Sequence, residues 1–392
     1  MPGRRECALV AISLFIAAVF AEIGLRIADI SFPIFHQMEP LRGWAPLPGV
    51  SGMWRTEGEA HVSINREGFR DRDHEPAKPP GAYRIAIIGD SMTEGLAVPV
   101  SDTFWSVLER KLAACDPLDG RPVEVMNYGV SGYGPAQERL TLKHNALKYE
   151  PDLVLLALFT GNDIQNSERT LDGHKDRVYY TLENGALILD DSNTRAGRFK
   201  WKRFWRTLRN TIINTSNLFQ VIREGTTRFR NLMRAGESNG GGQAVFSPTS
   251  REYEVFQVPK TSEWRKAWAT TEALVGAIHN DSVSGGATFL LAVLPGPVQV
   301  YPDIALRQEF ADSLGVSDLG YADRRLTAFA ERANIPGVAL EEPLRHYTDS
   351  TGTYLHGFPK AVLGTAHWND GGPPPARETP ARHAAHTIPS RH

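Results

Sequence analysis

The sequence predicts a three-layer α/β domain whose core is a doubly wound parallel β-sheet. From Tyr83 onward, short apolar runs alternate with stretches in which apolar residues recur every three or four positions. These are the patterns of strands and of helices. The apolar runs are continuous, as in strands that helices cover on both faces. Together the two patterns indicate parallel strands joined by helical crossovers.

Each element follows from one of these patterns. Continuous apolar runs predict strands at 84–88, 123–128, 153–159, 287–294 and 338–340. Helical periodicity predicts helices at 104–114, 135–146, 262–279 and 321–332. The sheet domain is therefore expected to cover residues 83–370, after a lead-in segment at 31–82.

An insertion is predicted between the third and fourth strands, at about 165–260. The interval of roughly a hundred residues is far longer than a usual connection. It begins with a hairpin, in which Asn184-Gly185 supplies a favoured two-residue turn. Glycines at 236–242 indicate a flexible loop near its end.

Inside the insertion, residues 198–209 are rich in Arg, Lys and Trp and continue as a predicted helix towards Ile222. One interpretation is a surface that binds a membrane or an anionic glycan. The other is a solvated helix whose Trp and Phe side chains face the core. We favour the second from the sequence.

The N-terminus has the pattern of an export signal. Arg4 and Arg5 precede an apolar run from Ala8 to Ala21, and Glu22 ends the run. Extended towards Arg26, the segment approaches the length that spans a bilayer, so residues 1–30 are expected to be an uncleaved membrane anchor. Small residues around Ala21 also fit a cleavable signal, which would make the protein secreted or periplasmic. A buried helix of a cytosolic protein is the third alternative.

Composition excludes several classes of protein. The 43 Lys and Arg residues nearly balance 45 Asp and Glu residues, so the net charge is −2 and nucleic acid is not an expected partner. Two cysteines cannot form a disulfide framework. The sequence has no CxxC, HExxH or GxxxxGK pattern, so no metal or cofactor is expected. The tail at 371–392 opens with Gly-Gly-Pro-Pro-Pro and has no apolar periodicity, which predicts disorder.

Polar or glycine-rich turns follow the first three predicted strands. Gly89-Asp90-Ser91 ends the first strand, Gly132 lies in the turn after the second, and Asn162 follows the third. The carboxyl ends of parallel strands meet at one edge of the sheet, where such folds build their sites. A serine there could attack a substrate, while backbone N–H groups and an Asn amide could bind an oxyanion. Each turn alone could be only a cap or a tight turn.

These blocks, with a late His367-Trp-Asn, resemble the SGNH (GDSL-type) hydrolase family in the family's order. The segment 65–70 resembles a lead-in of its membrane-anchored members and is given no catalytic role. The resemblance implies a flavodoxin-like sheet, with Ser91 as nucleophile and His367 as general base. It also implies an oxyanion hole made of the Ser91 N–H, the Gly132 N–H and the Asn162 side chain.

Two features depart from the family pattern. The acid usually found three residues before the histidine is replaced by Gly364, and Thr365 is not a carboxylate either. A backbone carbonyl could then hold the ring of a Ser–His dyad, or Asp370 or another acid brought near by folding could supply the carboxylate. The family's closing helix cannot begin across the three prolines after Gly372, so part of the sheet is expected to be uncovered.

The expected function is therefore that of an exported serine ester hydrolase that forms an acyl-Ser91 intermediate. Its substrate would be a small acyl ester or an acylated glycan. The first alternative is an O-acyltransferase acting on a cell-envelope or exported polysaccharide, through the same intermediate. The second is an inactive glycan-binding or scaffold protein, which the missing acid suggests.

Overall fold

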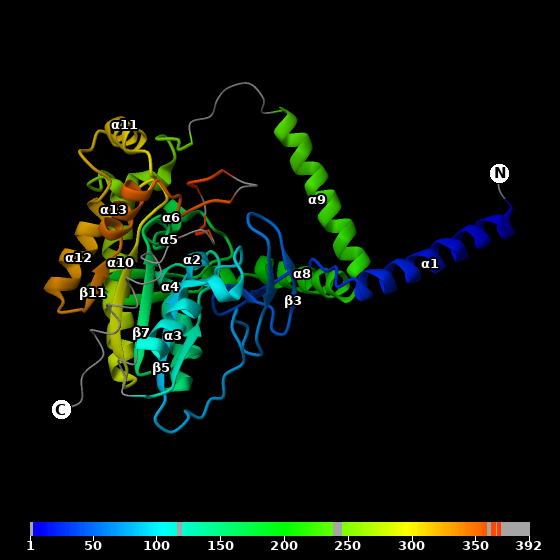
Figure 1. Cartoon of the computed structure of the whole chain (residues 1–392), viewed down its shortest axis with the longest axis horizontal. Helices are drawn as coiled ribbons and strands as arrows, with labels where there is room; N and C mark the ends of the chain where they lie inside the picture. Colours follow the sequence, from blue (N-terminus) through cyan, green and yellow to red (C-terminus); the bar gives the residue numbers. More distant parts are fainter. Residues whose placement is uncertain (1–2, 116–119, 238–244, 359–361, 366, 370–392) are drawn as a thin grey trace.

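The computed structural model describes residues 3–115, 120–237, 245–358, 362–365 and 367–369 (Figure 1). Its centre is a five-stranded sheet in the order β11-β10-β7-β5-β6, and every pairing in it is parallel. This order corresponds to the flavodoxin-like arrangement, in which the chain changes direction beside its first strand. The predicted three-layer, doubly wound fold is confirmed. The strands are β5 (Tyr83–Gly89), β6 (Val123–Asn127), β7 (Leu153–Phe159), β10 (Thr288–Leu294) and β11 (Gly337–Ala339).

Helices cover both faces of this sheet. Alternate residues of each strand point to opposite faces, so Ile85 and Ile87 belong to one core cluster and Ala86 and Ile88 to the other. The first cluster lies under α3 (Phe104–Cys115) and α13 (Glu341–Thr351), and the second under α4 (Pro135–His144), α10 (Ser262–Ser284) and α12 (Tyr321–Arg332). Among the described residues, the face expected to be uncovered carries α13 and Leu355, so that expectation is not confirmed. The predicted core elements all form, with ends that differ by a few residues.

The remaining helices are shorter or lie outside the sheet. They are α2 (Ser91–Glu94), α5 (Asp163–Asn166), α6 (Arg169–Asp172), α7 (Ser192–Arg195), α11 (Ile304–Leu314), and the 3₁₀ helices η1 (Val100–Asp102), η2 (Ala146–Tyr149) and η3 (Arg251–Phe256).

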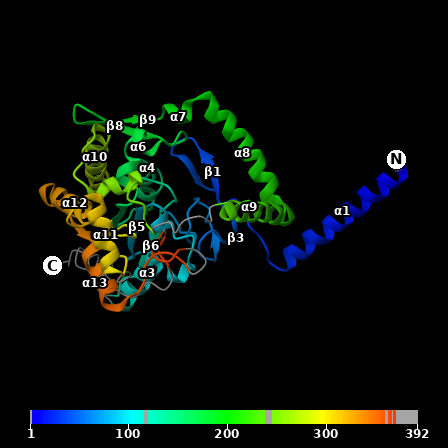
Figure 2. The ribbon, with the colours of Figure 1, turned by 90° about the horizontal axis from the view of Figure 1, so that it is seen from above.

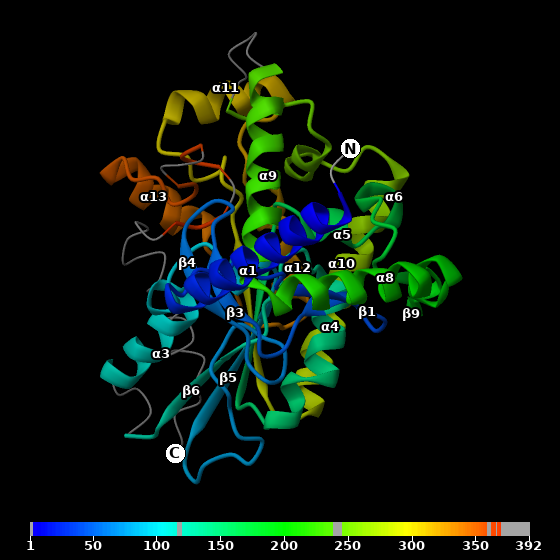
Figure 3. The ribbon, with the colours of Figure 1, turned by 90° about the vertical axis from the view of Figure 1, so that its right-hand side faces the viewer.

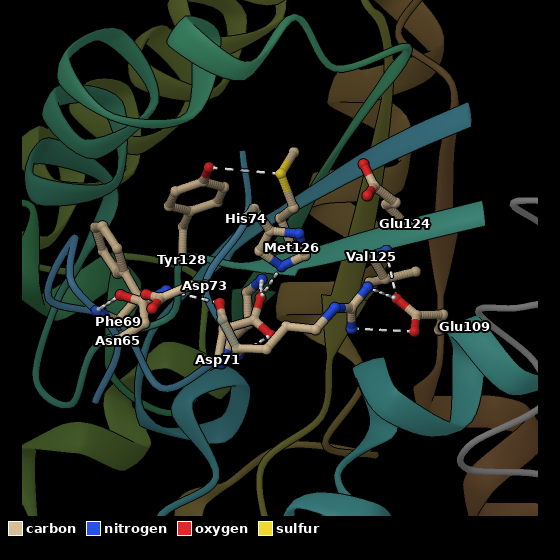
Figure 4. A network of polar contacts seen from close by, with 12 residues as sticks. Asn65, Phe69, Asp71, Asp73, His74, Glu109, Glu124, Val125, Met126 and Tyr128 are labelled. Atoms are coloured by element: carbon tan, nitrogen blue, oxygen red, sulfur yellow. Dashed lines mark hydrogen bonds and ion pairs between the residues drawn. The ribbon is translucent and has the colours of Figure 1, made fainter. Parts of the chain in front are cut away.

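The lead-in segment forms two small hairpins that the sequence did not predict. The first pairs β1 (His36–Glu39) with β2 (Gly43–Pro46), and the second pairs β3 (Ser51–Trp54) with β4 (Ala60–Ser63). The segment that follows, which contains Asp71 and His74, is hydrogen-bonded to the end of β6 (Figure 4). Asp71 Oδ2 accepts hydrogen bonds from the Asn127 N–H at 2.8 Å and from His74 Nε2 at 3.0 Å. The lead-in is therefore part of the folded domain.

The insertion contains the predicted hairpin, β8 (Tyr179–Glu183) paired with β9 (Ala186–Asp190). The predicted single basic helix is instead two helices, α8 (Gly197–Thr215) and α9 (Asn217–Glu237), which meet at Ser216. A residue far away in the sequence stabilises this break. Glu22 of the N-terminal segment accepts hydrogen bonds from the Asn217 and Leu218 N–H groups, at 3.1 and 2.9 Å. Gly236, the first residue of the predicted glycine loop, belongs to α9 instead, and residues 238–242 of that prediction lie outside the described residues.

The N-terminal segment forms one helix, α1 (Arg4–Ile27), which projects away from the sheet domain (Figures 1 and 2). None of its residues is buried, and by length and composition it could cross a membrane. A cleavable signal sequence has the same properties. The predicted disordered tail, 371–392, lies outside the described residues.

Candidate active site

Ser91 lies at the carboxyl end of β5, as the first residue of the short helix α2. The chain turns there because Asp90 caps the helix, accepting a hydrogen bond from the Met92 N–H at 2.9 Å. The cap leaves the Ser91 side chain only partly buried, at the edge of the sheet where its strand order reverses. This is the position at which open α/β sheets bind ligands.

Asn162 reaches the same edge from β7, the strand hydrogen-bonded to β5. Its Nδ2 atom lies 3.2 Å from Asp90 Oδ2, and the Ser91 Oγ lies 3.4 Å from the same oxygen. The buried Asp90 carboxyl group thus brings Ser91 and Asn162 together. An amide carries two N–H bonds, so one remains for a ligand after the bond to Asp90 is made.

Gly132 belongs to a loop that three side chains hold in place. Trp44 Nε1 donates to the Ser131 carbonyl at 2.9 Å, and Arg177 donates to the Gly132 carbonyl at 2.6 Å. Glu94 of α2 accepts a hydrogen bond from the Ser131 N–H at 2.6 Å, which ties the loop to the helix of Ser91. A trans peptide directs its C=O and N–H in opposite directions, so the Trp44 bond also fixes the direction of the Gly132 N–H.

The backbone N–H groups of Ser91 and Gly132 remain available. Within the described ranges, neither donates a hydrogen bond to another protein atom. The first belongs to the serine itself and the second to a loop tied to α2, so both are candidate donors for a developing oxyanion.

His367 lies in a C-terminal loop that pairs with residues 355–357. The Gly357 N–H donates to the His367 carbonyl at 2.9 Å, and the Asn369 N–H donates to the Leu355 carbonyl at 3.0 Å. His367 and Ser91 line one small pocket, together with Val98, Phe104 and Trp368. No hydrogen bond joins the two side chains in the described structure; such contacts are often long before substrate binds.

The acid partner of His367 comes from the lead-in segment. Glu57 Oε2 lies 2.7 Å from His367 Nδ1, although 310 residues separate the two in the sequence. The alternative in which a backbone carbonyl holds the ring does not fit this contact, whereas the alternative of another acid brought near by folding does. Asp370, the other expected partner, lies outside the described residues.

Close packing brings Glu57 to this position. Glu57 lies in the turn of the β3–β4 hairpin, next to Gly58. A Cβ atom on Gly58 would lie 2.1 Å from the Ala97 carbonyl oxygen and 2.6 Å from the Phe358 ring, so only glycine permits this approach.

The position of the usual family acid cannot hold a side chain. Gly364 has a φ of +80°, and a Cβ atom there would lie 2.1 Å from the Tyr301 ring. A carboxylate can therefore approach His367 from the β3–β4 hairpin but not from position 364.

Charge interactions at the site favour a charged pair. Burial alone would lower the pKa of His367, but the Glu57 carboxylate, with contributions from Asp90 and Glu94, raises it above its usual range. Burial likewise opposes ionisation of Glu57, yet the contact with His367 lowers the pKa of Glu57. An imidazolium at His367 is thus stabilised by an adjacent carboxylate.

A residue of the lead-in, Arg70, also stabilises the end of α2. The buried Arg70 side chain donates to the carbonyl groups of Glu94 at 3.1 Å, Gly95, and Val98 at 2.5 Å, which lie at and beyond the end of α2. Burial lowers the pKa of Arg70 to about 10, so the group remains charged at neutral pH. Arg70 therefore helps to position the segment that carries Ser91.

No protein-family model matches the sequence, and no curated protein matches it. Solved structures resemble the chain in part. An acetyl xylan esterase named AlAXEase is 11% identical, with a TM-score of 0.39, and covers 78% of this chain and 99% of its own. A lipase/acylhydrolase from Enterococcus faecalis is 14% identical, with a TM-score of 0.35, and covers 78% of this chain and 95% of its own. At such identities and TM-scores, residue roles rest on the geometry of this chain alone.

The structure brings the predicted residues Ser91, Gly132 and Asn162 to one sheet edge, and His367 to the pocket beside it. Sequence reasoning missed Glu57. The Glu57-Gly58 pair in the lead-in is not a sufficient signal, because the same pair occurs at 67–68, 94–95 and 224–225. In the described part of the chain, no group of three or more His, Cys, Asp or Glu side chains could hold a metal ion.

Proposed function

We propose that the chain is a serine ester hydrolase of the SGNH type, held in the membrane by α1 with its sheet domain outside the cytoplasm. The contact of 2.7 Å between Glu57 Oε2 and His367 Nδ1, at a pocket that Ser91 also lines, carries the proposal. A carboxylate, a histidine and a serine in this relation are the components of acyl transfer through a covalent intermediate.

The first half of the reaction acylates Ser91. The Nδ1–H group of His367 donates its hydrogen bond to Glu57, which leaves Nε2 as the proton acceptor. Nε2 accepts the proton of Ser91 Oγ as this oxygen attacks the ester carbonyl carbon. The bond between the carbonyl carbon and the alcohol oxygen then breaks, and His367 gives its proton to the leaving oxygen. In the second half, water loses a proton to His367 and attacks the acyl carbon; the bond between this carbon and Ser91 Oγ then breaks, and His367 returns the proton to Oγ.

The negative oxygen of each tetrahedral intermediate would be bound by three donors: the N–H groups of Ser91 and Gly132 and the free N–H bond of the Asn162 amide. These donors are held before substrate arrives, because Asp90 fixes Asn162 and Trp44 fixes the Gly132 peptide. Preorganised donors stabilise the transition state without reorganisation.

The pocket favours a short acyl group. Its volume is about 40 Å³, which accommodates only a few water molecules, and the large side chains of Phe104 and Trp368 are among those that line it. We therefore expect acetyl and other short acyl esters to be better substrates than long-chain esters.

The proposal is tested by assaying the purified full-length chain on short-chain aryl esters and acetylated glycans, with and without an acceptor sugar. Release of acid without an acceptor supports the hydrolase. Turnover that requires the acceptor reassigns the protein as an O-acyltransferase. Lack of both, with a folded protein, supports the inactive scaffold instead.

The proposed location has a separate test. A reporter fused to the C-terminus should be active only on the outer side of the membrane, and high salt should not release the protein. Recovery of a soluble chain beginning near Glu22 would show that the segment is a cleaved signal.

A further inference from the structure

The insertion helices α8 and α9 turn their apolar side chains to the outside. We define the α8–α9 apolar face by its exposed large apolar residues: Trp201, Phe204, Trp205, Leu208 and Ile212 of α8, and Phe219, Ile222, Phe229 and Met233 of α9. Trp201 is 65% exposed and Phe204 is 58% exposed. The preferred sequence interpretation, that the Trp and Phe side chains of 198–209 face the core, holds for Phe199 and is wrong for Trp201, Phe204 and Trp205.

Three uncharged polar side chains, Asn210, Asn214 and Gln220, face the protein instead, whereas the basic side chains of α8 are mostly exposed together with the apolar ones. Asn214 exchanges two hydrogen bonds with the Ile34 backbone, at 2.8 and 3.0 Å. Gln220 accepts a hydrogen bond from the Phe32 N–H at 2.7 Å, and Asn210 donates to the His36 carbonyl at 3.2 Å. A helix on a water-exposed surface normally has the opposite arrangement. The reversed arrangement indicates that something apolar covers the outer face.

The junction of α8 and α9 is bound to the end of α1. Besides its bonds to the start of α9, Glu22 accepts a hydrogen bond from Ser216 Oγ at 2.8 Å, and Arg26 donates to the Thr215 carbonyl at 2.7 Å. In Figure 3 the three helices α1, α8 and α9 lie together on the side of the molecule turned to the viewer.

The length of α1 sets the height of this junction in a bilayer. Its 24 residues extend about 36 Å, slightly more than a hydrocarbon core of about 30 Å. With the apolar part of α1 in the bilayer, Glu22 and Arg26 lie at the outer boundary. The start of α9 and the end of α8 must then lie at that boundary too.

We infer that the α8–α9 apolar face lies in the outer surface of the membrane, beside α1, and contacts lipid. The inference rests on the proposed anchor but not on the proposed chemistry. Trp201, Phe204 and Trp205 form one aromatic cluster, with ring centroids 5.3–6.4 Å apart, and such rings favour the headgroup level. Exposed Lys200, Arg203 and Arg206 flank this cluster, which complements anionic headgroups.

The test uses the full-length chain in nanodiscs of phosphatidylcholine and phosphatidylglycerol, some of whose lipids carry a nitroxide. Cys7 and Cys115 are replaced by serine, and single cysteines are labelled with a fluorophore. Phe204→Cys probes α8 and Ile222→Cys probes α9. Ile304→Cys, at an exposed position on α11, is the matched control, and Phe15→Cys reports insertion of α1.

We expect the lipid nitroxide to quench the labels at 204 and 222 several-fold more than the label at 304. Quenching at 15 without quenching at 204 and 222 would overturn the inference and leave the anchor intact. Labels at 204 and 222 that are shielded from an aqueous quencher but not reached by lipid would also overturn it, in favour of a protein contact. The absence of quenching at 15, 204 and 222 would overturn the anchor as well. Because no outcome depends on catalysis, failure here is separable from failure of the hydrolase proposal.

Discussion

Ser91 and Asn162 reach the candidate site from the ends of neighbouring strands, whereas His367 and Glu57 reach it from loops far apart in the sequence. The first pair is placed by the sheet itself, because parallel strands end at a common edge. The second pair depends on how the β3–β4 hairpin packs against Ala97 and Phe358. The positions of Ser91 and Asn162 therefore follow from the topology of the sheet, whereas those of His367 and Glu57 follow from the packing of segments outside the sheet.

The largest effect is expected for Ser91→Ala, which removes the proposed nucleophile. Turnover should fall by about 10³ to 10⁶, whereas the melting temperature should hardly change. The reason is that the hydroxyl group makes a single long hydrogen bond, to Asp90 at 3.4 Å. Ester hydrolysis and thermal unfolding measure the two quantities, and Ser101→Ala, at an exposed serine of η1, is the control. Substantial activity in Ser91→Ala would remove the serine from the mechanism.

Glu57→Gln tests the half of the site that depends on packing. Turnover should fall by up to about 10⁴, since the amide no longer stabilises the imidazolium or its tautomer. Glu59→Gln, in the same turn, is a matched control, because Glu59 forms an exposed ion pair with Arg55 at 2.8 Å. Equal activities of the two variants would show that Glu57 is not the acid.

The pH dependence of Glu57→Gln separates an electrostatic role from a structural one. His367 must be neutral to act as a base, and Glu57 raises the pKa of His367. Activity of the natural protein should therefore rise with pH through a pKa above the usual histidine range. In Glu57→Gln that pKa falls, so the acidic limb of the profile should move to lower pH. A loss of activity without this movement would indicate misfolding of the hairpin.

Asn162→Ala should have an intermediate effect, a loss of about 10² to 10³ in turnover, the usual result of removing one oxyanion donor. The change should appear in kcat and only weakly in the melting temperature, because the Asn162 side chain makes one hydrogen bond, to Asp90. Steady-state kinetics and calorimetry distinguish this from a turn residue. Unfolding with unchanged activity per folded molecule would contradict the assignment.

Asp370→Asn is expected to have the smallest effect, less than about tenfold, because Glu57 already contacts the ring nitrogen that an acid would hold. A loss as large as that of Glu57→Gln, measured in the same assay on folded protein, would show that the two acids exchange roles during the reaction.

The sheet and the serine side could be predicted because their signals are local. Continuous apolar runs identified the strands, and the turns containing Ser91, Gly132 and Asn162 follow directly from strand ends. Glu57 could not be predicted this way, because nothing in a short window of sequence shows that a hairpin turn reaches a histidine 310 residues away. The obstruction at Gly364 by the Tyr301 ring is equally invisible in the sequence.

The insertion shows the same limit at a larger scale. Its helical periodicity was readable, but the break at Ser216 and the outward direction of Trp201 depend on contacts with Glu22 and with the lead-in backbone. Periodicity identifies two faces of a helix without showing which one meets the protein. The lipid contact proposed above would explain why the apolar face is the outer one here.

Activation of Ser91 as a nucleophile by the Glu57–His367 pair can be measured by treating the full-length protein with a fluorophosphonate and locating the adduct by mass spectrometry. Rates are compared for the natural protein, Glu57→Gln and His367→Ala. We expect one adduct, on the peptide that contains Ser91, formed much more slowly in both variants. A folded protein that forms no adduct, forms it on another residue, or reacts equally fast in Glu57→Gln would show that Ser91 is not activated in this way.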